Sequence, residues 1–539
     1  MQRNTPNPVI ESALKSPVVA EGAVTLWLTA IGLAATGTWL LFDAAPGLNW
    51  FLVTLLIAAG LFTVTWRKTR GRSLRRDWLP VALAIVLAGG AILTSNGFFH
   101  FWIALGVFTQ FAILTLLCAG LPAERLGPAR TAFAPLPALR LVCLEVTQRS
   151  DTEARALLRN ERNYRTLRGI ALALPIVALF FLLLGAADPT LAAWRDALGE
   201  LLGDSSMIGR LLLFALIFTA LLGLYGIALR APPASALDPP RQPRAALTDV
   251  ERTIVLGSVA ALFALFLGLQ VSYLFGNPGE TPGSGLTFAE ALHRGFGEIT
   301  IVVTLCAWLI IALDRHAIRG TREPLVRVLE VLVVAACALL LASAYHRLVS
   351  YEAAYGYTTL RLYVAIYIAA AAMALALLAW EIWRGIDLVR LTRRIMVVAV
   401  LALCTPIYWN SAAWVVRQNL ARRHSTDNVD TAYWPNGLSA DAVPQIVAAL
   451  PLLPRAQAEE LARNLKQRHT SLSDPAGNHS RWYEWNLRRE AARRALQSLP
   501  SLNVHLAPAS PPRATPQRAP PRSPRPVRSV SAADATPAP

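Results

Sequence analysis

Charged residues are scarce in this chain. Only 16% of its 539 residues are Asp, Glu, Lys or Arg, whereas a soluble domain usually carries about a quarter. Hydrophobic residues make up 54% and gather in nearly uncharged blocks of about 17–22 residues, the length at which a helix crosses the hydrocarbon core of a bilayer. A soluble core helix of this length would have a polar face, and most of these blocks have none. The sequence therefore predicts an all-α fold, a polytopic transmembrane helical bundle.

Lysine is almost absent. Three of the 51 basic residues are lysines, and the formal net charge is +17. The arginines cluster in short loops beside the apolar blocks, where basic residues orient membrane proteins. We therefore interpret the positive charge as a signal of membrane topology. The expected partner is the lipid bilayer, and no nucleic acid is expected to bind. Five cysteines show neither metal-ligand spacing nor a disulfide framework.

Sequence motifs of common enzyme classes are also missing. The chain has no Walker loop, no His-Glu-x-x-His, no Cys-x-x-Cys, no Gly-x-Ser-x-Gly and no Gly-x-Gly-x-x-Gly after a strand. We expect no cofactor, no metal and no catalytic residue, and we favour a protein that is not an enzyme.

Eleven spans are expected along the chain. They cover about 24–42, 50–66, 78–94, 99–120, 169–187, 210–229, 254–274, 298–313, 326–345, 360–380 and 395–410. The expected organisation is a cytoplasmic N-terminal segment (1–23), four transmembrane helices (24–121), a cytoplasmic helical loop (122–168), transmembrane helices five to eleven (169–410), a helical extramembrane tail (411–502) and a disordered Pro/Arg-rich end (503–539). The first span is read as an uncleaved anchor.

Alternate loops carry most of the arginines, as in "RKTRGRSLRRD", "DRHAIRGTREPL" and "EIWRGIDLVRLTRR". The positive-inside rule puts these loops and the N-terminus in the cytoplasm of a bacterial inner membrane. An odd number of spans then makes the tail periplasmic. One miscounted span would reverse its side, and the tail's own basic charge favours that alternative.

Three stretches of the tail are predicted to be helices. "LSADAVPQIVAALPLL" begins with the capping residues Ser439 and Asp441, and "RAQAEELARNLKQRH" follows a proline. "SRWYEWNLRREAARRALQSL" sets Trp482 and Trp485 beside arginines. This third helix either lies on a membrane surface or packs on its neighbours with its arginines in water.

Polar residues gather where two predicted spans meet, in "SAYHRLVSYEAAYGYTTLRLY", Ser343 to Tyr363. A helix from Pro324 past Tyr351 is too long for the bilayer, so its last turns must stand above it. Gly356 can end this helix and Thr358 can start the next. The stretch is then an aromatic belt on a helical hairpin. Alternatively, it forms an outward-facing polar pocket with the segment "LTFAEALHRGFGE". The candidate cluster at the outer rim is Glu290, His293, Arg294, Glu298, Arg347, Tyr351, Glu352, Tyr355 and Arg361.

Two further sets of polar residues can be considered as possible sites. Glu330 lies about one turn inside the ninth span near Arg327, which favours an interface ion pair. His100, His293 and His346 could meet at a metal, but nothing in their spacing requires it.

Three motifs, "YLFGNPGETPGSGLTFAEALHRGFGEI", "SAYHRLVSYEAAYGYTTLRLY" and "LSADAVPQIVAAL", resemble in the same order those of a bacterial integral-membrane family, domain of unknown function 4173, over roughly 170–500. The matching residues, to which the resemblance assigns no roles, are Phe288, Ala289, Glu290, Arg294, Gly295, Phe296, Tyr351, Tyr355, Gly356, Leu360, Arg361 and Tyr363. The chain departs from that family at "NSAAWVVRQNLARR", where relatives have an asparagine-rich "NPD" opening to the tail. The resemblance implies the architecture and the two rim motifs, and it implies no activity.

We therefore expect a non-enzymatic inner-membrane protein. At its outer face it would bind an envelope protein or a component that is lipid-like or lipid-linked. A secondary transporter or channel is the first alternative. A membrane-embedded enzyme acting on a lipid-linked substrate, with Glu290, His293 or Glu352 as acid or base, is the second.

Overall fold

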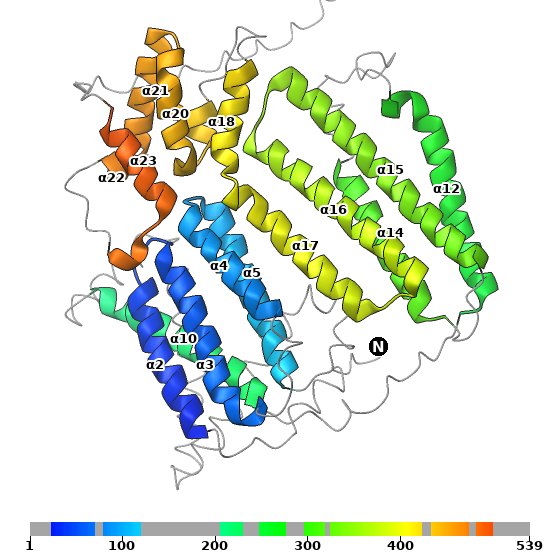
Figure 1. Cartoon of the computed structure of the whole chain (residues 1–539), viewed down its shortest axis with the longest axis horizontal. Coiled ribbons are helices and arrows are strands. Elements are labelled where there is room, and N and C mark those ends of the chain that lie inside the picture. Colours follow the sequence, from blue (N-terminus) through cyan, green and yellow to red (C-terminus); the bar gives the residue numbers. More distant parts are fainter. Residues whose placement is uncertain are drawn as a thin grey trace, which may run out of the picture. The chain divides into compact units, whose positions relative to one another are not determined.

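The computed structural model describes residues 23–69, 79–119, 205–229, 247–275, 296–317, 324–422, 433–473 and 481–499. The chain divides into two units, Met1–Leu499 and Pro500–Pro539, and every described residue lies in the first. Within the described ranges the regular elements are all helices (Figure 1). One isolated β-bridge pairs Leu247 with Ala317. The all-α prediction is confirmed for this part of the chain. The disordered end expected at 503–539 lies outside it.

The first helices form one packed group. Its members are α2 (Ala23–Leu41), α3 (Leu48–Thr69), α4 (Leu79–Leu93), α5 (Gly97–Cys118) and α10 (Ser205–Leu229). They share a core that includes Leu26, Leu61 and Tyr225. The Tyr225 hydroxyl donates 2.8 Å to the Ile57 carbonyl, so this buried polar group is satisfied.

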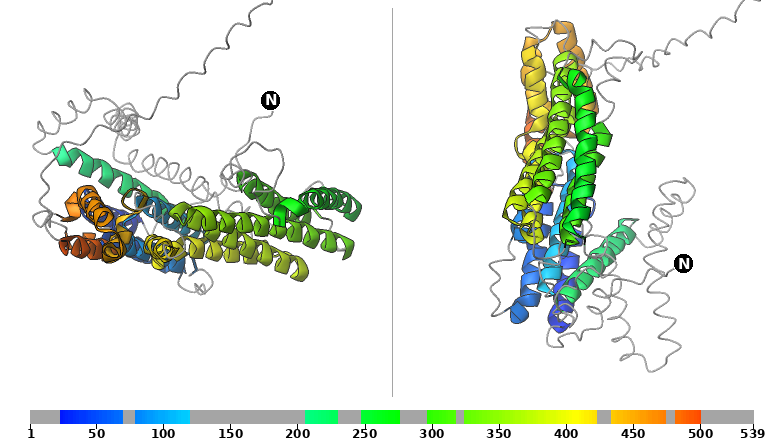
Figure 2. Two further views of the ribbon diagram at one scale, coloured as in Figure 1. Left: turned by 90° about the horizontal axis from the view of Figure 1, so that it is seen from above. Right: turned by 90° about the vertical axis from the view of Figure 1, so that its right-hand side faces the viewer.

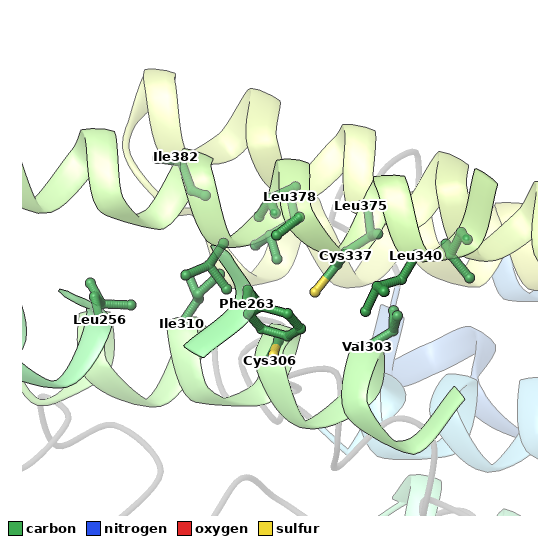
Figure 3. Packing of buried hydrophobic residues seen from close by; sticks show 14 of the residues in the cluster. Leu256, Phe263, Val303, Cys306, Ile310, Cys337, Leu340, Leu375, Leu378 and Ile382 are labelled. Atoms are coloured by element: carbon green, nitrogen blue, oxygen red, sulfur yellow. The ribbon is translucent and has the colours of Figure 1, made fainter. Parts of the chain in front are cut away.

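The later helices form a second packed group. Its members are α12 (Asp249–Phe275), α14 (Phe296–Arg315), α15 (Pro324–Tyr355), α16 (Thr359–Arg384) and α17 (Leu388–Tyr408). Ile310, Cys337 and Leu375 lie in its core, shown in Figure 3. Helices α15 and α16 run side by side in Figures 1 and 2. Helix α17 packs on α16 and also on α4 and α5, so it joins the two groups.

Six of these helices are long and apolar enough to cross a membrane: α3, α5, α10, α12, α15 and α16. A seventh span is possible if α17 and α18 (Ser411–Arg422), which meet at a 60° bend, count together. Helices α2 and α4 are apolar but shorter. Side chains such as Leu28, Leu216 and Leu262 are about two-thirds exposed, as lipid contact requires.

The chain is therefore a multi-pass membrane protein, embedded in a lipid bilayer. The structure does not show eleven spans: the expected span at 169–187 and the expected cytoplasmic loop at 122–168 lie outside the described residues.

The tail is built from short helices around a core that also includes Leu362 of α16. After α18 come α19 (Tyr433–Gly437), η5 (Ala440–Ala442), α20 (Val443–Ala449), η6 (Leu450–Leu452), α21 (Arg455–Arg468), α22 (Thr470–Ser473), η7 (Trp482–Glu484) and α23 (Leu487–Gln497). Trp434, at 1% exposure, is one of the fully buried side chains of this core. All three stretches predicted to be helical contain helices.

The tail covers one end of the bundle, which we call the tail-covered end. The Tyr483 hydroxyl donates to the Trp39 carbonyl at the end of α2, and the Leu48 amide at the start of α3 donates to the Trp485 carbonyl. The tail also contacts the loop between α4 and α5, the end of α17 and the start of α16. The loops around Asp43, Ser95 and Tyr357, all expected on one side of the membrane, thus lie on one side of the bundle.

Buried ion pairs occupy the opposite end. Arg252 of α12, 1% exposed, donates 3.0 Å to Glu330 of α15, and Asp249 lies 3.1 Å from the same guanidinium. The ion pair expected for Glu330 is present, but its partner is Arg252 from another helix and not the sequence neighbour Arg327. Glu381 pairs in the same way with two arginines of α17.

Candidate functional site

The hairpin between α15 and α16 forms as its sequence predicts. Helix α15 continues to Tyr355, so it is about 48 Å long and exceeds the hydrocarbon core. Gly356 then adopts φ +81°, a left-handed conformation that ends helices. Thr358 caps α16 by accepting a hydrogen bond from the Arg361 amide.

Two arginines satisfy the carbonyl groups left open at the end of α15. Arg361 of α16 donates to the Gly356 carbonyl and, at 3.3 Å, to the Tyr355 carbonyl. Arg422 of α18 donates to the Glu352 carbonyl at 2.8 Å and to the Ala353 carbonyl. The last carbonyls of a helix carry partial negative charge, so cations are favoured there. Both arginines therefore hold the hairpin in shape.

Side chains following α17 also fix the turn of the hairpin. Asn419 accepts from the Tyr357 amide and donates to the Tyr357 carbonyl, both at 2.8 Å. The Tyr433 hydroxyl accepts from the Thr359 amide at 3.1 Å. The turn is thereby attached to the tail by bonds between residues more than 60 positions apart.

An aromatic and cationic face results on α15. The rings of Tyr351 and Tyr355 lie 4.7 Å apart, and the Arg361 guanidinium lies 4.2 Å above the Tyr351 ring. Tyr355 is 53% exposed, and Arg347 and Tyr351 are half-buried. The expected aromatic surface on the hairpin is present. We call Arg347, Tyr351, Glu352, Tyr355 and Arg361 the hairpin cluster.

Glu352 differs from the rest of the hairpin cluster because its side chain is buried, at 9% exposure. Its carboxylate is attracted by the charge of Arg361 but makes no hydrogen bond or ion pair with any residue of the described ranges. The stem of the side chain is covered, but its oxygens are not among the fully buried polar atoms that lack a partner, so they stay accessible. The carboxylate is therefore an acceptor available beside exposed tyrosine rings.

The other predicted rim residues stay untested. Glu290, His293 and Arg294 lie outside the described residues, and for Glu298, in the first turn of α14, only the backbone is described. The predicted pocket between the two motifs stays a prediction. Within the described ranges, no three His, Cys, Asp or Glu side chains come together as metal ligands do.

A second polar cluster at the tail-covered end was not found from the sequence. Asp441, 4% exposed, accepts from the Thr94 hydroxyl at 2.6 Å and from the Ser95 amide and hydroxyl at 2.7 and 2.6 Å. The residue was expected to cap a helix, but Ser439 is the N-cap position of η5 and Asp441 bonds across to the α4–α5 loop instead. A loop rich in hydroxyl groups is the only local signal, because 346 positions separate the partners.

Residues of α23 lock the same junction. Asn486 caps α23 and donates to the carbonyls of Ala91 and Thr94 at 2.8 and 2.7 Å. Arg488 donates to the Ile407 carbonyl, and burial lowers the pKa of its guanidinium while Asp441 opposes this effect. The predicted membrane-surface helix is thus a packed helix, although Trp482 and Trp485 beside it are 64% and 47% exposed. The packed alternative places the arginines of this helix in water, but not all of them lie there.

Comparison with known families identifies a match over most of the chain. The family model described as "Domain of unknown function (DUF4153)" matches residues 23–449. The resemblance to domain of unknown function 4173 is therefore wrong: short aromatic and arginine motifs on a hairpin do not separate two such families. No curated protein and no solved structure matches the chain.

Proposed function

We propose that this chain, which belongs to the family of domain of unknown function 4153, is a non-enzymatic membrane protein that binds a lipid-like component of the bacterial envelope at its hairpin cluster. The family description states no activity, so the proposal depends on the chain's own residues. One observation carries it: the carboxylate of Glu352, whose side chain is only 9% exposed, has no hydrogen-bonding partner in the described ranges.

The chemistry of the cluster indicates the kind of ligand. A carboxylate accepts hydrogen bonds from hydroxyl or ammonium groups, and exposed aromatic rings contact the apolar faces of such head groups. Arg361 is engaged with carbonyls and with the Tyr351 ring, so it orients the site. We expect a lipid or lipid-linked molecule whose head group carries hydroxyl or amine donors.

The rigidity of the hairpin favours a ligand-binding role over a role only as an aromatic belt. Asn419 and Arg422 fix the turn and the last carbonyls of α15, so little freedom is left to lose on binding. The site stands at the tail-covered end, opposite the arginine-rich loop between α16 and α17. By the positive-inside rule, we propose that it faces the periplasm.

A secondary transporter or channel is the second candidate. It is favoured by the buried pair of Arg252 and Glu330 in the first two turns of two candidate spans, because ionisable residues inside spans often mark transport paths. Ion flux through reconstituted vesicles that is lost in Glu330→Gln would support this candidate over the first.

Photo-cross-linking tests the first candidate. A photoreactive amino acid at Tyr355 in intact cells should capture a lipid-like adduct, identified by mass spectrometry. Because a hydrogen bond to a charged group contributes about 1.5–3 kcal/mol, Glu352→Gln should lower the adduct yield about tenfold or more.

The matched control is Glu459→Gln, an exposed carboxylate of α21 that is expected to leave the yield unchanged. Equal adduct yields in Glu352→Gln and in the unsubstituted protein would contradict the proposal.

A further inference from the structure

A groove lies where the two helix groups meet, between α4, α5 and α17. Its volume is about 400 Å³, within the range of pockets that hold small molecules. Leu87, Trp102, Gln110, Thr392 and Ala399 are among its lining residues. Trp102 and Ala399 are partly or largely exposed, so the groove opens on the outside of the bundle, toward lipid.

One polar side chain in this groove has no partner. Gln110 is 4% exposed, and neither its Oε1 nor its amide nitrogen makes a hydrogen bond within the described part of the chain. An unsatisfied buried amide is costly, because it loses hydration without gaining a hydrogen-bonding partner. The neighbouring hydroxyl of Thr392 is satisfied, since it donates 2.6 Å to the Leu388 carbonyl. The carboxamide of Gln110 is therefore the hydrogen-bonding group that the groove offers to a ligand.

A free positive charge flanks the same end of the groove. Arg390 and Arg394 both pair with Glu381. Arg393, one residue after Thr392, is half-buried and makes no ion pair or hydrogen bond with another described residue. From Thr392 to Leu403, helix α17 extends the lining by about 16 Å away from this charge.

These features fit one occupant. We infer that the groove holds one acyl chain of an anionic phospholipid, with an ester carbonyl that accepts a hydrogen bond from the Gln110 amide nitrogen and with its phosphate at Arg393. Basic residues beside a slot between transmembrane helices bind phosphate head groups in this way. The lipid fills the seam between the two helix groups and stays bound, unlike the exchanging lipids around it. This site is independent of the function proposed for the hairpin cluster.

Filling the groove tests the inference. Ala399→Trp places an indole in the slot, and Leu401→Trp, two residues further on the same helix, is the control because Leu401 is 56% exposed and does not line the groove. Each protein is purified in mild detergent, offered phosphatidylglycerol, and examined by native mass spectrometry. We expect Ala399→Trp to lower the lipid-bound fraction about tenfold and Leu401→Trp to leave it unchanged. Equal retention in both would overturn the inference.

Two polar variants test the head-group contacts. Arg393→Gln should abolish a preference for phosphatidylglycerol over phosphatidylcholine, and Gln110→Leu should lower retention of both lipids. No preference in the unsubstituted protein would overturn the assignment of an anionic lipid.

A photoreactive acyl chain on phosphatidylglycerol tests the site without any substitution. Labelling should concentrate on α5 and α17 near Trp102 and Met396. Labelling spread evenly over the helices would also overturn the inference.

Discussion

At the scale of single residues, Asp441 makes the most concentrated set of long-range bonds at the tail-covered end. Three donors from Thr94 and Ser95 converge on its carboxylate, and the side chain is buried. Asp441→Asn removes the charge that strengthens these bonds. We expect the free energy of unfolding of the detergent-solubilised protein to fall by about 2 kcal/mol, with a lower thermal midpoint. Amide hydrogen exchange in α23 should become faster.

The control for this prediction is Glu459→Gln. Glu459 pairs with Arg455 on the tail surface, where both side chains are largely exposed. Surface pairs contribute about 0–1 kcal/mol, so this change should leave the midpoint nearly unaltered. A loss as large as that in Asp441→Asn would show that the tail tolerates no charge removal and would contradict the specific role of Asp441.

Gly356 is a second residue whose role can be measured. Its φ of +81° costs other residues about 1–2 kcal/mol, and an added Cβ would lie 3.0 Å from Asn419 Oδ1 and 3.1 Å from Arg422 Nη1. Gly356→Ala should therefore lower the thermal midpoint. Gly257→Ala is the control, because nothing lies within 4 Å of its added Cβ and alanine favours a helix. Equal midpoints in the two variants would contradict the account of the turn.

His469, which follows α21, makes the stability of the tail depend on pH. Burial, with a smaller effect of Arg468, lowers the pKa of its imidazole below the usual value of about 6.5. The unfolded chain then binds a proton more readily than the folded tail, so stability is full above about pH 6.5 and falls as the pH drops below it. In His469→Gln, the thermal midpoint should therefore depend less on pH between pH 5 and 7. An unchanged pH profile in the variant would contradict the role of burial.

At the scale of elements, the end of α15 is held by arginines from two different helices. Arg361 and Arg422 donate to neighbouring carbonyls of one helix end, so loss of one changes the surroundings of the other. In a cycle of Arg361→Gln, Arg422→Gln and the double variant, we expect an interaction energy of about 0.5 kcal/mol or more. Strictly additive losses of stability would show that the two caps act separately.

Local sequence signals predicted this hairpin well, because they act within a few residues. A glycine that can turn left-handed, followed by a threonine that can cap, determines the end of one helix and the start of the next. The contacts of Asp441 and of Glu330 with distant helices were not predictable in the same way. Their partners lie 346 and 78 positions away, and a polar residue's type does not indicate which distant group it meets.

The same limit applies to the candidate site. The sequence indicated Tyr351, Glu352 and Tyr355 from their position at a span end, but not that Arg361 would bind the carbonyls of α15 or that Asn419 would hold the turn. Gln110 carried no signal, since one glutamine in an apolar helix is usually satisfied by a neighbour.

At the scale of the whole molecule, the tail and three loops of the bundle lie together, whereas the ion pairs of Arg252 and Glu381 lie at the other end. The arginine-rich loops are expected in the cytoplasm, so the tail, the hairpin cluster and their ligand are expected in the periplasm. The function proposed for the hairpin cluster depends on this orientation, because envelope components are reached from that side.

Reporter insertions measure the orientation directly. A reporter active only in the periplasm and one active only in the cytoplasm are each inserted after Ser480 in the tail and after Ile386 in the α16–α17 loop. We predict periplasmic activity at Ser480 and cytoplasmic activity at Ile386. Cytoplasmic activity at Ser480 would place the hairpin cluster inside the cell and contradict binding of an envelope component there.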